Sequence, residues 1–284
     1  MDCTLGMGGH SEALLSSHPG VQVLGLDRDP EAIERATERL GSFGERFRTC
    51  RCDFKETKRW TSSLEDEHAE GILCDLGMSG YQLKASRGFS FQDADSLDMR
   101  MDPDQGKPAS DFLNTASRDE LAEVFRRYGE EPQAWRIATA IAEVRDETPI
   151  RTARALAELI FGTVSHKRRQ GRIHPATKVF QALRIHVNGE LDDLDGFLKR
   201  AAEALNPGGR LVVIAYHSLE DRIVKGAFRD LAGKCTCPPR LPVCVCGARE
   251  VLGPLTRRAL RPSPEEVERN PSSRSARLRA GVKR

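Results

Sequence analysis

The stretch Asp2–Ser11, DCTLGMGGHS, joins the end of an apolar strand to a glycine-rich turn and the start of a helix. Glycines at such a turn let a ligand approach the backbone closely. Ser11 is expected to cap a helix over residues 12–17, because a serine hydroxyl can accept a hydrogen bond from a first-turn amide. A strand, a glycine-rich turn and a helix in this order are typical of the first unit of a parallel α/β fold.

Strand and helix signals alternate as far as residue 76. Val21–Leu26 is a short apolar strand that ends at Asp27, and Asp29 is a typical cap for the helix that follows. Phe47–Phe54 and Gly71–Leu76 are predicted as the third and fourth strands. Strands separated by helices at these intervals predict an open parallel sheet.

A long helical block interrupts this pattern. No strand pattern is visible between Leu83 and Pro175, and this span is far longer than an ordinary connection between two strands. Strand patterns return with Arg210–Tyr216, an apolar run typical of a strand buried on both faces, and the tail from Val251 can supply two last strands. The predicted domains are the first part of a sheet domain (1–82), an inserted all-helical domain (83–175), and the second part of the sheet domain with a basic C-terminal tail (176–284).

The charge of the chain is distributed unevenly. The formal net charge is only +2, but residues 222–284 hold 15 Lys and Arg against 5 Asp and Glu, and residues 151–186 hold 8 against 1. Two basic regions favour a polyanionic partner, most commonly a nucleic acid, over ordinary solvated faces. No apolar run is long enough to span a bilayer and no secretory signal is visible, so we expect a cytoplasmic protein without membrane contact.

Acidic residues follow the predicted strands where a ligand would bind. Asp27 lies 19 residues after Gly8 and Asp75 lies near the end of the fourth strand, at the edge where open α/β sheets bind ligands. Ser11 stands where a dinucleotide fingerprint needs its third glycine. Carboxylates of Asp2, Asp27 and Asp75 suit a cationic, phosphate-free nucleoside such as S-adenosylmethionine better than an anionic dinucleotide. A methyltransferase is therefore favoured over a nicotinamide oxidoreductase.

Further motifs resemble one family along nearly the whole chain. The chain resembles the RsmH (MraW) family in the blocks DCTLGMGGHS (2–11), DLGMS (75–79), RGFSF (87–91), LDMRMD (97–102), YGEE (128–131), HPAT (174–177), FQALRI (180–185), HSLEDRIVK (217–225), NP (270–271) and RSA (274–276). The resemblance implies a class I S-adenosylmethionine-dependent methyltransferase fold with an inserted helical substrate-binding domain. It also implies methylation of the N4 amine of a cytosine in the decoding region of 16S rRNA, with the small ribosomal subunit as partner.

The resemblance also implies a cofactor pocket. Gly8 and Gly9 would let the backbone approach the amino-acid part of S-adenosylmethionine, and Asp27 would bind its ribose. Phe54 is either a packing surface for adenine or a core aromatic residue, and Gln82 rests on the resemblance alone. The implied cofactor-binding residues are Gly8, Gly9, His10, Asp27, Phe54, Asp75 and Gln82.

Asp75 is also the candidate catalytic residue. The N4 amine of cytosine is a weak nucleophile because its lone pair is delocalised into the ring, and a nearby acceptor would stabilise the charge that develops on nitrogen. A carboxylate that only binds the cofactor is the alternative interpretation. A flipped-out base would need a stacking partner, and the candidates, each also a candidate core residue, are Tyr81, Phe89, Phe91 and Tyr216. His217 and Asp221 are expected to line the same pocket.

Basic residues of one polar loop are expected to contact phosphates: Lys167, Arg168, Arg169 and Arg172.

Four cysteines lie near the C-terminus, and four thiolates are the number that a structural zinc site requires. Their C-x-C spacing is tighter than usual, and reduced thiols explain them equally well: Cys235, Cys237, Cys244 and Cys246.

Two rival functions stay open. One is another amino-methyltransferase, acting on transfer RNA or DNA, and the other is a non-catalytic RNA-binding assembly factor that keeps the cofactor pocket.

The glycine-rich turn begins only five residues after Met1, so the first strand is expected to lose ladder hydrogen bonds, which suggests a truncated or misplaced start. The sequence is silent on oligomeric state.

Overall fold

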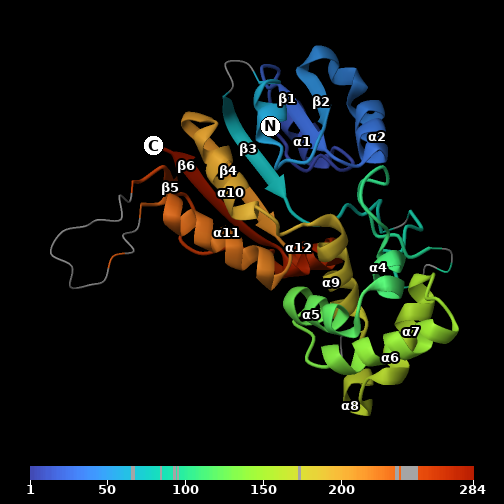
Figure 1. Ribbon diagram of the computed structural model, residues 1–284. Coiled ribbons are helices and arrows are strands. Elements are labelled where there is room, and N and C mark those ends of the chain that lie inside the picture. The colour runs from blue at the N-terminus through green and yellow to red at the C-terminus, as the bar shows by residue number, and fades with distance from the viewer. Residues whose placement is uncertain are drawn as a thin grey trace. The chain divides into compact units, whose positions relative to one another are not determined.

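The computed structural model describes residues 1–64, 68–83, 85–91, 94, 96–171, 174–233, 237 and 249–284. They form two compact units (Figure 1). The first unit comprises Met1–Gly77 and Leu191–Arg284, and the second comprises the intervening Met78–Glu190. Among the described residues, no helix is long and apolar enough to cross a membrane.

The first unit combines a sheet with helices. Its strands are β1 (Val23–Asp27), β2 (Phe47–Arg51), β3 (Ala69–Asp75), β4 (Leu205–Ala215), β5 (Leu252–Pro254) and β6 (Arg277–Lys283). Its helices are α1 (Gly9–Ser17), α2 (Pro30–Leu40), α3 (Thr57–Thr61), α10 (Leu194–Glu203), α11 (Ser218–Leu231) and α12 (Pro264–Arg269), with 3₁₀ turns η1 (Gly41–Arg46) and η3 (Pro271–Ser275).

The sheet is parallel as far as β4 and ends in antiparallel pairings. β1 pairs with β2 and β3 with β4, both in parallel, and Asp2 links the two pairs by bridging Gly25 of β1 and Leu73 of β3. β6 then runs antiparallel to β4 and to β5, as Figure 1 shows. The spatial order is β2, β1, residues 1–5, β3, β4, β6 and β5. The predicted parallel sheet, with two last strands from the tail, is confirmed.

Residues 1–5 bond to both neighbours at the centre of the sheet. On one side Asp2 N–H donates to the Leu24 carbonyl (2.9 Å) and Leu26 N–H donates to the Asp2 carbonyl (2.8 Å). On the other side Cys3 N–H donates to the Leu73 carbonyl (2.8 Å), and Leu73 N–H donates to the Met1 carbonyl (2.9 Å). Residues 1–5 thus pair with both neighbours, but as the sequence predicts they form a short segment whose bridges are confined to Asp2.

Helices cover both faces of the sheet. Val23 packs with Leu15 of α1 and Leu40 of α2, whereas its neighbours Leu24 and Leu26 belong to the larger apolar cluster that includes α10 and α11. Successive residues of a strand point to opposite faces, so α1 and α2 lie on one face and α10 and α11 on the other.

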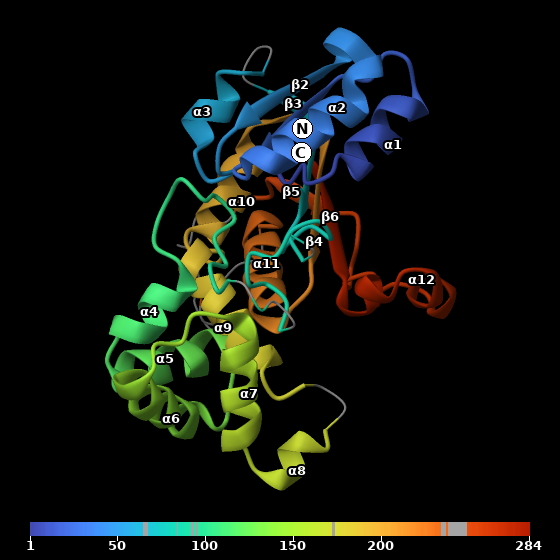
Figure 2. The same cartoon turned by 90° about the vertical axis from the view of Figure 1, so that its right-hand side faces the viewer.

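The second unit is helical and has its own core (Figure 2). Its helices are α4 (Ala109–Thr115), α5 (Arg118–Gly129), α6 (Ala134–Glu147), α7 (Ala153–Thr163), α8 (His166–Arg169) and α9 (Thr177–Asn188). Its apolar cluster draws on most of these helices and on the preceding loop, where Leu97 and Met99 are almost completely buried. Asn188 ties this loop to α9, because its side chain accepts a hydrogen bond from Met101 N–H (2.8 Å) and donates one to the Met99 carbonyl (2.7 Å).

The helical unit is longer than the inserted domain predicted for residues 83–175. It begins at Met78 and ends at Glu190, so α9 belongs to it rather than to the second part of the sheet domain. The physical reason is that Val179, Phe180 and Leu183 of α9 are buried in the helical core. An amphipathic helix carries the same periodicity whichever core it joins, so the sequence pattern placed this boundary wrongly.

The first helix begins earlier than predicted. α1 starts at Gly9, so Ser11 lies inside it and caps nothing. Its buried hydroxyl instead donates a hydrogen bond to the Asp2 carboxylate (2.8 Å). This bond fixes the first turn of α1 to the centre of the sheet.

Candidate active site

The ends of four strands and one turn meet at a single edge of the sheet. In a parallel sheet the carboxyl ends of all strands lie at the same edge. That edge therefore brings together the turn after residues 1–5, Asp27 of β1, the residues after β2, Asp75 of β3 and Tyr216 after β4. Most of the predicted site residues come from these positions.

The glycine-rich turn has one position that requires glycine and one that is open. Gly8 has φ 75°, and a Cβ there would lie 2.9 Å from Leu40 Cδ1, so α2 packs closely under the turn. A Cβ at Gly9 would meet nothing within 4 Å. Gly8 therefore shapes the turn, whereas Gly9 leaves free space at the start of α1.

Asp2 is completely buried and is bonded by the fold itself. Its carboxylate accepts hydrogen bonds from the Ser11 hydroxyl (2.8 Å) and from Thr4 N–H (3.2 Å). Burial raises the pKa of Asp2, and these two hydrogen bonds oppose that rise. Asp2 therefore contributes a buried carboxylate beneath the turn rather than a group exposed to a ligand.

Asp27 closes the glycine-rich turn against β1. One carboxylate oxygen accepts a hydrogen bond from Gly6 N–H (2.9 Å) and the other from Asp29 N–H (2.9 Å). Burial raises the pKa of Asp27, and the two amide hydrogen bonds oppose the rise. Each oxygen keeps a second lone pair, so the carboxylate can still accept from a hydroxyl donor.

Only one carboxylate oxygen of Asp75 has a hydrogen-bond partner among the described residues. Its Oδ2 lies 3.2 Å from His10 Nε2, and its backbone N–H donates to the Thr4 hydroxyl (2.7 Å). Its Oδ1 is buried and has no hydrogen-bond partner within the described part of the chain. A buried oxygen without a partner is costly, so Oδ1 is poised to accept a hydrogen bond from a ligand.

Two neighbours respond to the charge of Asp75. The hydrogen bond with Asp75 raises the pKa of His10, while partial burial of the imidazole opposes the rise. Burial raises the pKa of the Tyr216 phenol first, followed by the charge of Asp75 and by a side-chain hydrogen bond with Asp75. His10, Asp75 and Tyr216 are thus brought together by three separate elements.

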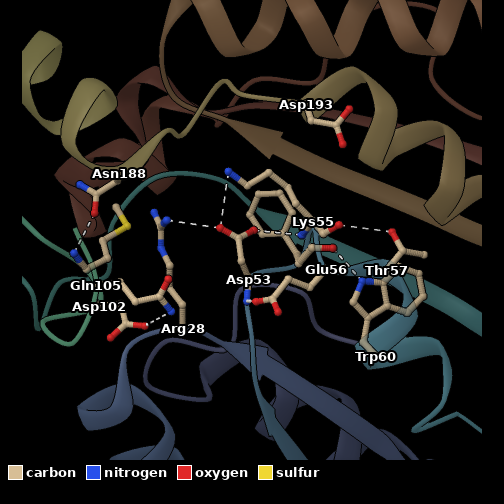
Figure 3. A network of polar contacts seen from close by, with 12 residues as sticks. Arg28, Asp53, Lys55, Glu56, Thr57, Trp60, Asp102, Gln105, Asn188 and Asp193 are labelled. Carbon is tan, nitrogen blue, oxygen red and sulfur yellow. Dashed lines mark hydrogen bonds and ion pairs between the residues drawn. The ribbon is translucent and has the colours of Figure 1, made fainter.

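Phe54 lies beside this edge on the loop after β2. Its ring packs against Phe197 of α10 with centroids 4.6 Å apart, and it remains partly exposed. The adjoining Asp53 contacts Arg28 (3.3 Å) and Lys55 (3.5 Å), which Figure 3 shows as one network. Phe54 therefore packs in the core and remains partly exposed, and its role as a packing surface for adenine stays a prediction.

Gln82 and three candidate stacking residues belong to the helical unit. Gln82 is buried, and its side-chain oxygen accepts a hydrogen bond from Ser79 N–H (3.0 Å). Phe89 is a core residue, and Phe91 stacks on His174 with centroids 4.9 Å apart. Tyr81 is partly buried in the same unit.

His217 and Asp221 serve the fold at the end of β4. His217 caps α11, because its Nδ1 accepts from Glu220 N–H (3.4 Å), and the buried Glu220 accepts in turn from Tyr216 N–H (2.9 Å). Asp221 pairs with Arg277 (2.7 Å) and Arg279 (2.9 Å) of β6. Sequence reasoning missed Glu220 as the residue that holds Tyr216, although the spacing His217-x-x-Glu220 is that of a capping box.

Thr4 is a second residue that sequence reasoning missed. Its hydroxyl holds the backbone of Asp75, which lies 71 residues away in the chain. The only signal in the sequence is its place two residues before the glycine-rich turn.

Two of the basic residues predicted to contact phosphates are held within the helical unit. Arg168 forms an ion pair with Glu131, whose side chain is completely buried. Arg169 donates to the carbonyls of Gly162 (2.7 Å) and Val164 (3.2 Å) and lies over the Phe161 ring. Lys167 is exposed. Arg172 lies outside the described residues.

The four cysteines proposed for zinc also fall largely outside the described residues. Cys235, Cys244 and Cys246 are not described, and Cys237 is partly buried. The choice between a zinc site and reduced thiols therefore stays a prediction.

Comparison with known proteins places the chain in a family. The model of the MraW methylase family matches residues 1–284. The chain belongs to the MraW methylase family. A relative from Thermomicrobium roseum, named ribosomal RNA small subunit methyltransferase H, is 53% identical over 99% of this chain and 86% of its own. A relative of the same name from Syntrophotalea carbinolica is 49% identical over 99% of this chain and 90% of its own.

The fold of this MraW methylase is that of class I methyltransferases, with the helical unit inserted after β3. A solved structure, an rRNA methylase from Streptococcus thermophilus, is 10% identical to the chain and superposes with a TM-score of 0.39, covering 99% of this chain and 84% of that one. The MraW family resemblance expected from the motifs is confirmed.

Proposed function

We propose that the protein transfers a methyl group from S-adenosylmethionine to the N4 amine of a cytosine in the decoding region of 16S rRNA in the small ribosomal subunit. Membership of the MraW methylase family and the name of the relatives support methylation of small-subunit rRNA. The observation that carries the residue assignment is the buried Oδ1 of Asp75, which has no hydrogen-bond partner among the described residues and lies at the same sheet edge as the glycine-rich turn.

The residues at this edge fit S-adenosylmethionine. The turn of residues 6–10 contains no lysine or arginine that would pair with a phosphate, whereas Asp27 and Asp75 provide carboxylates nearby. When bound, S-adenosylmethionine would supply an activated methyl group on a positively charged sulfur. The open space at Gly9 would admit the amino-acid part of this molecule, and carboxylates at the strand ends suit its positive charge.

The predicted cofactor-binding residues of the sheet domain have surroundings that suit a role in binding. Asp27 would accept from ribose hydroxyls through its remaining lone pairs, and Phe54 would pack its accessible side on adenine. Gly8 holds the turn open and His10 stands at its end. Gln82 is assigned by family resemblance, since it belongs to the helical unit. The proposed cofactor-binding residues are Gly8, Gly9, His10, Asp27, Phe54, Asp75 and Gln82.

Asp75 is proposed to act on the attacking amine. Its Oδ1 would accept a hydrogen bond from an N4 hydrogen, so that the nitrogen lone pair turns out of the ring toward the methyl carbon. The amine would form the new N–C bond as the methyl–sulfur bond breaks, one of its protons would pass to Asp75 Oδ1, and S-adenosylhomocysteine would leave with a neutral sulfur. Thr4, which accepts from the backbone N–H of Asp75, and Glu220, which accepts from the backbone N–H of Tyr216, hold the walls of this site in place.

Protonation of His10 should weaken binding of the positively charged cofactor. The pKa of His10 is raised above its ordinary 6.5 by its hydrogen bond to Asp75. As the pH falls through this raised pKa, His10 gains a charge that repels a sulfonium but not the neutral sulfur of S-adenosylhomocysteine. We expect the affinity ratio of the two ligands to shift toward S-adenosylhomocysteine on acidification, measured by calorimetry. In His10→Gln the affinity ratio should no longer shift with pH. If it shifted in that variant as much as in the wild type, the charge of His10 would not be the cause.

The function is tested with methyl-labelled S-adenosylmethionine and small subunits from a strain that lacks its own enzyme. The label is located by nuclease digestion and mass spectrometry. We expect N4-methylcytosine in 16S rRNA. Label on another base, or only on transfer RNA or duplex DNA, would refute the proposed substrate. Binding of the subunits without label would indicate a non-catalytic assembly factor.

A further inference from the structure

A basic loop is fixed along the outer side of β6. The segment after β5 continues beside this strand, where Leu255 N–H donates to the Ala280 carbonyl (3.0 Å) and Ala280 N–H donates to the Thr256 hydroxyl (3.1 Å). Leu260 and Leu278 then exchange two backbone hydrogen bonds (2.9 and 3.0 Å). Residues 257–259 therefore arch between two fixed points, and we call residues 257–261 the arginine loop.

The arginine loop carries three exposed positive charges. Arg257, Arg258 and Arg261 are all exposed, and none of them pairs with a carboxylate among the described residues. The sequence has no acidic residue between Glu250 and Glu265. The loop therefore presents an uncompensated positive charge to solvent.

The register of the sheet places the arginine loop at the same edge as Asp75. Asp75 lies opposite Ile214 of β4, Ile214 lies opposite Leu278 of β6, and Leu278 lies opposite Leu260. Neighbouring strands are about 4.8 Å apart, so three spacings separate Asp75 from the loop backbone by about 14 Å. A nucleic-acid strand with one nucleotide at Asp75 would reach the arginine loop within a few nucleotides.

We infer that Arg257, Arg258 and Arg261 bind the phosphates of the rRNA strand that flanks the target cytosine. This inference rests on the proposed function, and it adds the path of the substrate strand along the arginine loop. A base that leaves its stack needs its flanking backbone held. Guanidinium groups bind phosphate oxygens in a bidentate manner, and a loop already fixed at both ends loses little entropy on binding.

The composition of the loop favours nucleic acid over a protein partner. Leu255 and Leu260 are 52% and 58% exposed, and apolar side chains of this kind would suit a protein surface. They are outnumbered by three arginines with no acidic residue among them. Such a local excess of positive charge is the electrostatic pattern of a phosphate-binding surface.

Two double variants with the same change in charge test the inference. Arg257→Gln/Arg258→Gln removes two charges from the loop. The matched control, Arg48→Gln/Arg210→Gln, removes two exposed arginines near the amino ends of β2 and of the β4 segment that pairs with β3, at the opposite edge of the sheet. Binding of unmethylated small subunits is measured across a range of salt concentrations, together with kcat and KM for labelled methyl transfer. Calorimetric binding of S-adenosylmethionine checks that both variants are folded.

We expect the loop variant to bind subunits on the order of tenfold more weakly, with a proportionate rise in KM and an unchanged kcat. The slope of log affinity against log salt should decrease by about 1.4, because each phosphate contact on a single strand contributes about 0.7. The control should match the wild type. Equal affinities and equal salt slopes for the two variants would overturn the inference. Weaker binding by the loop variant with an unchanged salt slope would also overturn it, because that result would indicate a contact with a protein. Binding that depends on the loop without any methyl transfer would refute the proposed function and would leave only the phosphate-binding role of the loop.

Discussion

Replacing Asp75 by asparagine should lower kcat for methyl transfer by about 10²- to 10³-fold, the usual loss when one preorganised group that stabilises developing charge is removed. The amide keeps the size of the side chain, but its charge is gone and its oxygen is a weaker acceptor for the N4 hydrogen. The rate is measured on unmethylated small subunits with S-adenosylmethionine at saturating concentration, so that a change in cofactor affinity does not contribute.

Asp53→Asn is the matched control for this variant. Asp53 follows β2 at the same edge of the sheet, but its carboxylate is engaged by Arg28 and Lys55. We expect a kcat close to that of the wild type. If Asp75→Asn kept its kcat and lost only affinity for S-adenosylmethionine, Asp75 would be a cofactor-binding carboxylate with no chemical role.

A large loss of stability is expected when the contact between α5 and α9 is disturbed. A Cβ at Gly129 would lie 2.4 Å from the Lys178 carbonyl oxygen and 3.1 Å from its carbon, and both are backbone atoms. Gly129→Ala must therefore push the two helices apart, and overpacking of this kind costs about 1–3 kcal/mol. We expect a lower unfolding temperature by calorimetry and faster amide hydrogen exchange in α9.

Gly162→Ala is a control that should change the stability in the opposite direction. Gly162 lies in α7, and a Cβ there would meet nothing within 4 Å. Alanine is favoured over glycine in helices by up to about 1 kcal/mol, so this variant should be slightly more stable than the wild type. Equal stability of the two alanine variants would show that the close approach at Gly129 has no energetic weight.

Features that depend on local sequence were predictable. The turn at Gly8, the strands that end at Asp27 and Asp75, and the helical block between the two parts of the sheet each follow from residue periodicity or from backbone restrictions. Such patterns act over a few residues, so they depend little on distant parts of the chain.

Features that depend on partners distant in the sequence were not predictable. Ser11 has the chemistry of a helix cap, yet it bonds to Asp2, and Arg168 has the chemistry of a phosphate ligand, yet it pairs with Glu131. A side chain binds whichever partner the fold brings within reach, and composition cannot show which one that is. The prediction that α9 belongs to the sheet domain was wrong for the same reason.

The parallel sheet, the glycine-rich turn, the acidic strand ends and the family can all be read from the amino-acid sequence. The three-dimensional arrangement was needed to show that Asp75 has a buried oxygen without a described partner, that Thr4 and Glu220 support the site, and that Leu260 lies in register with Asp75. The physical reason is that secondary structure arises from neighbours along the chain, whereas a site arises from strands that hydrogen bonding aligns across the sheet.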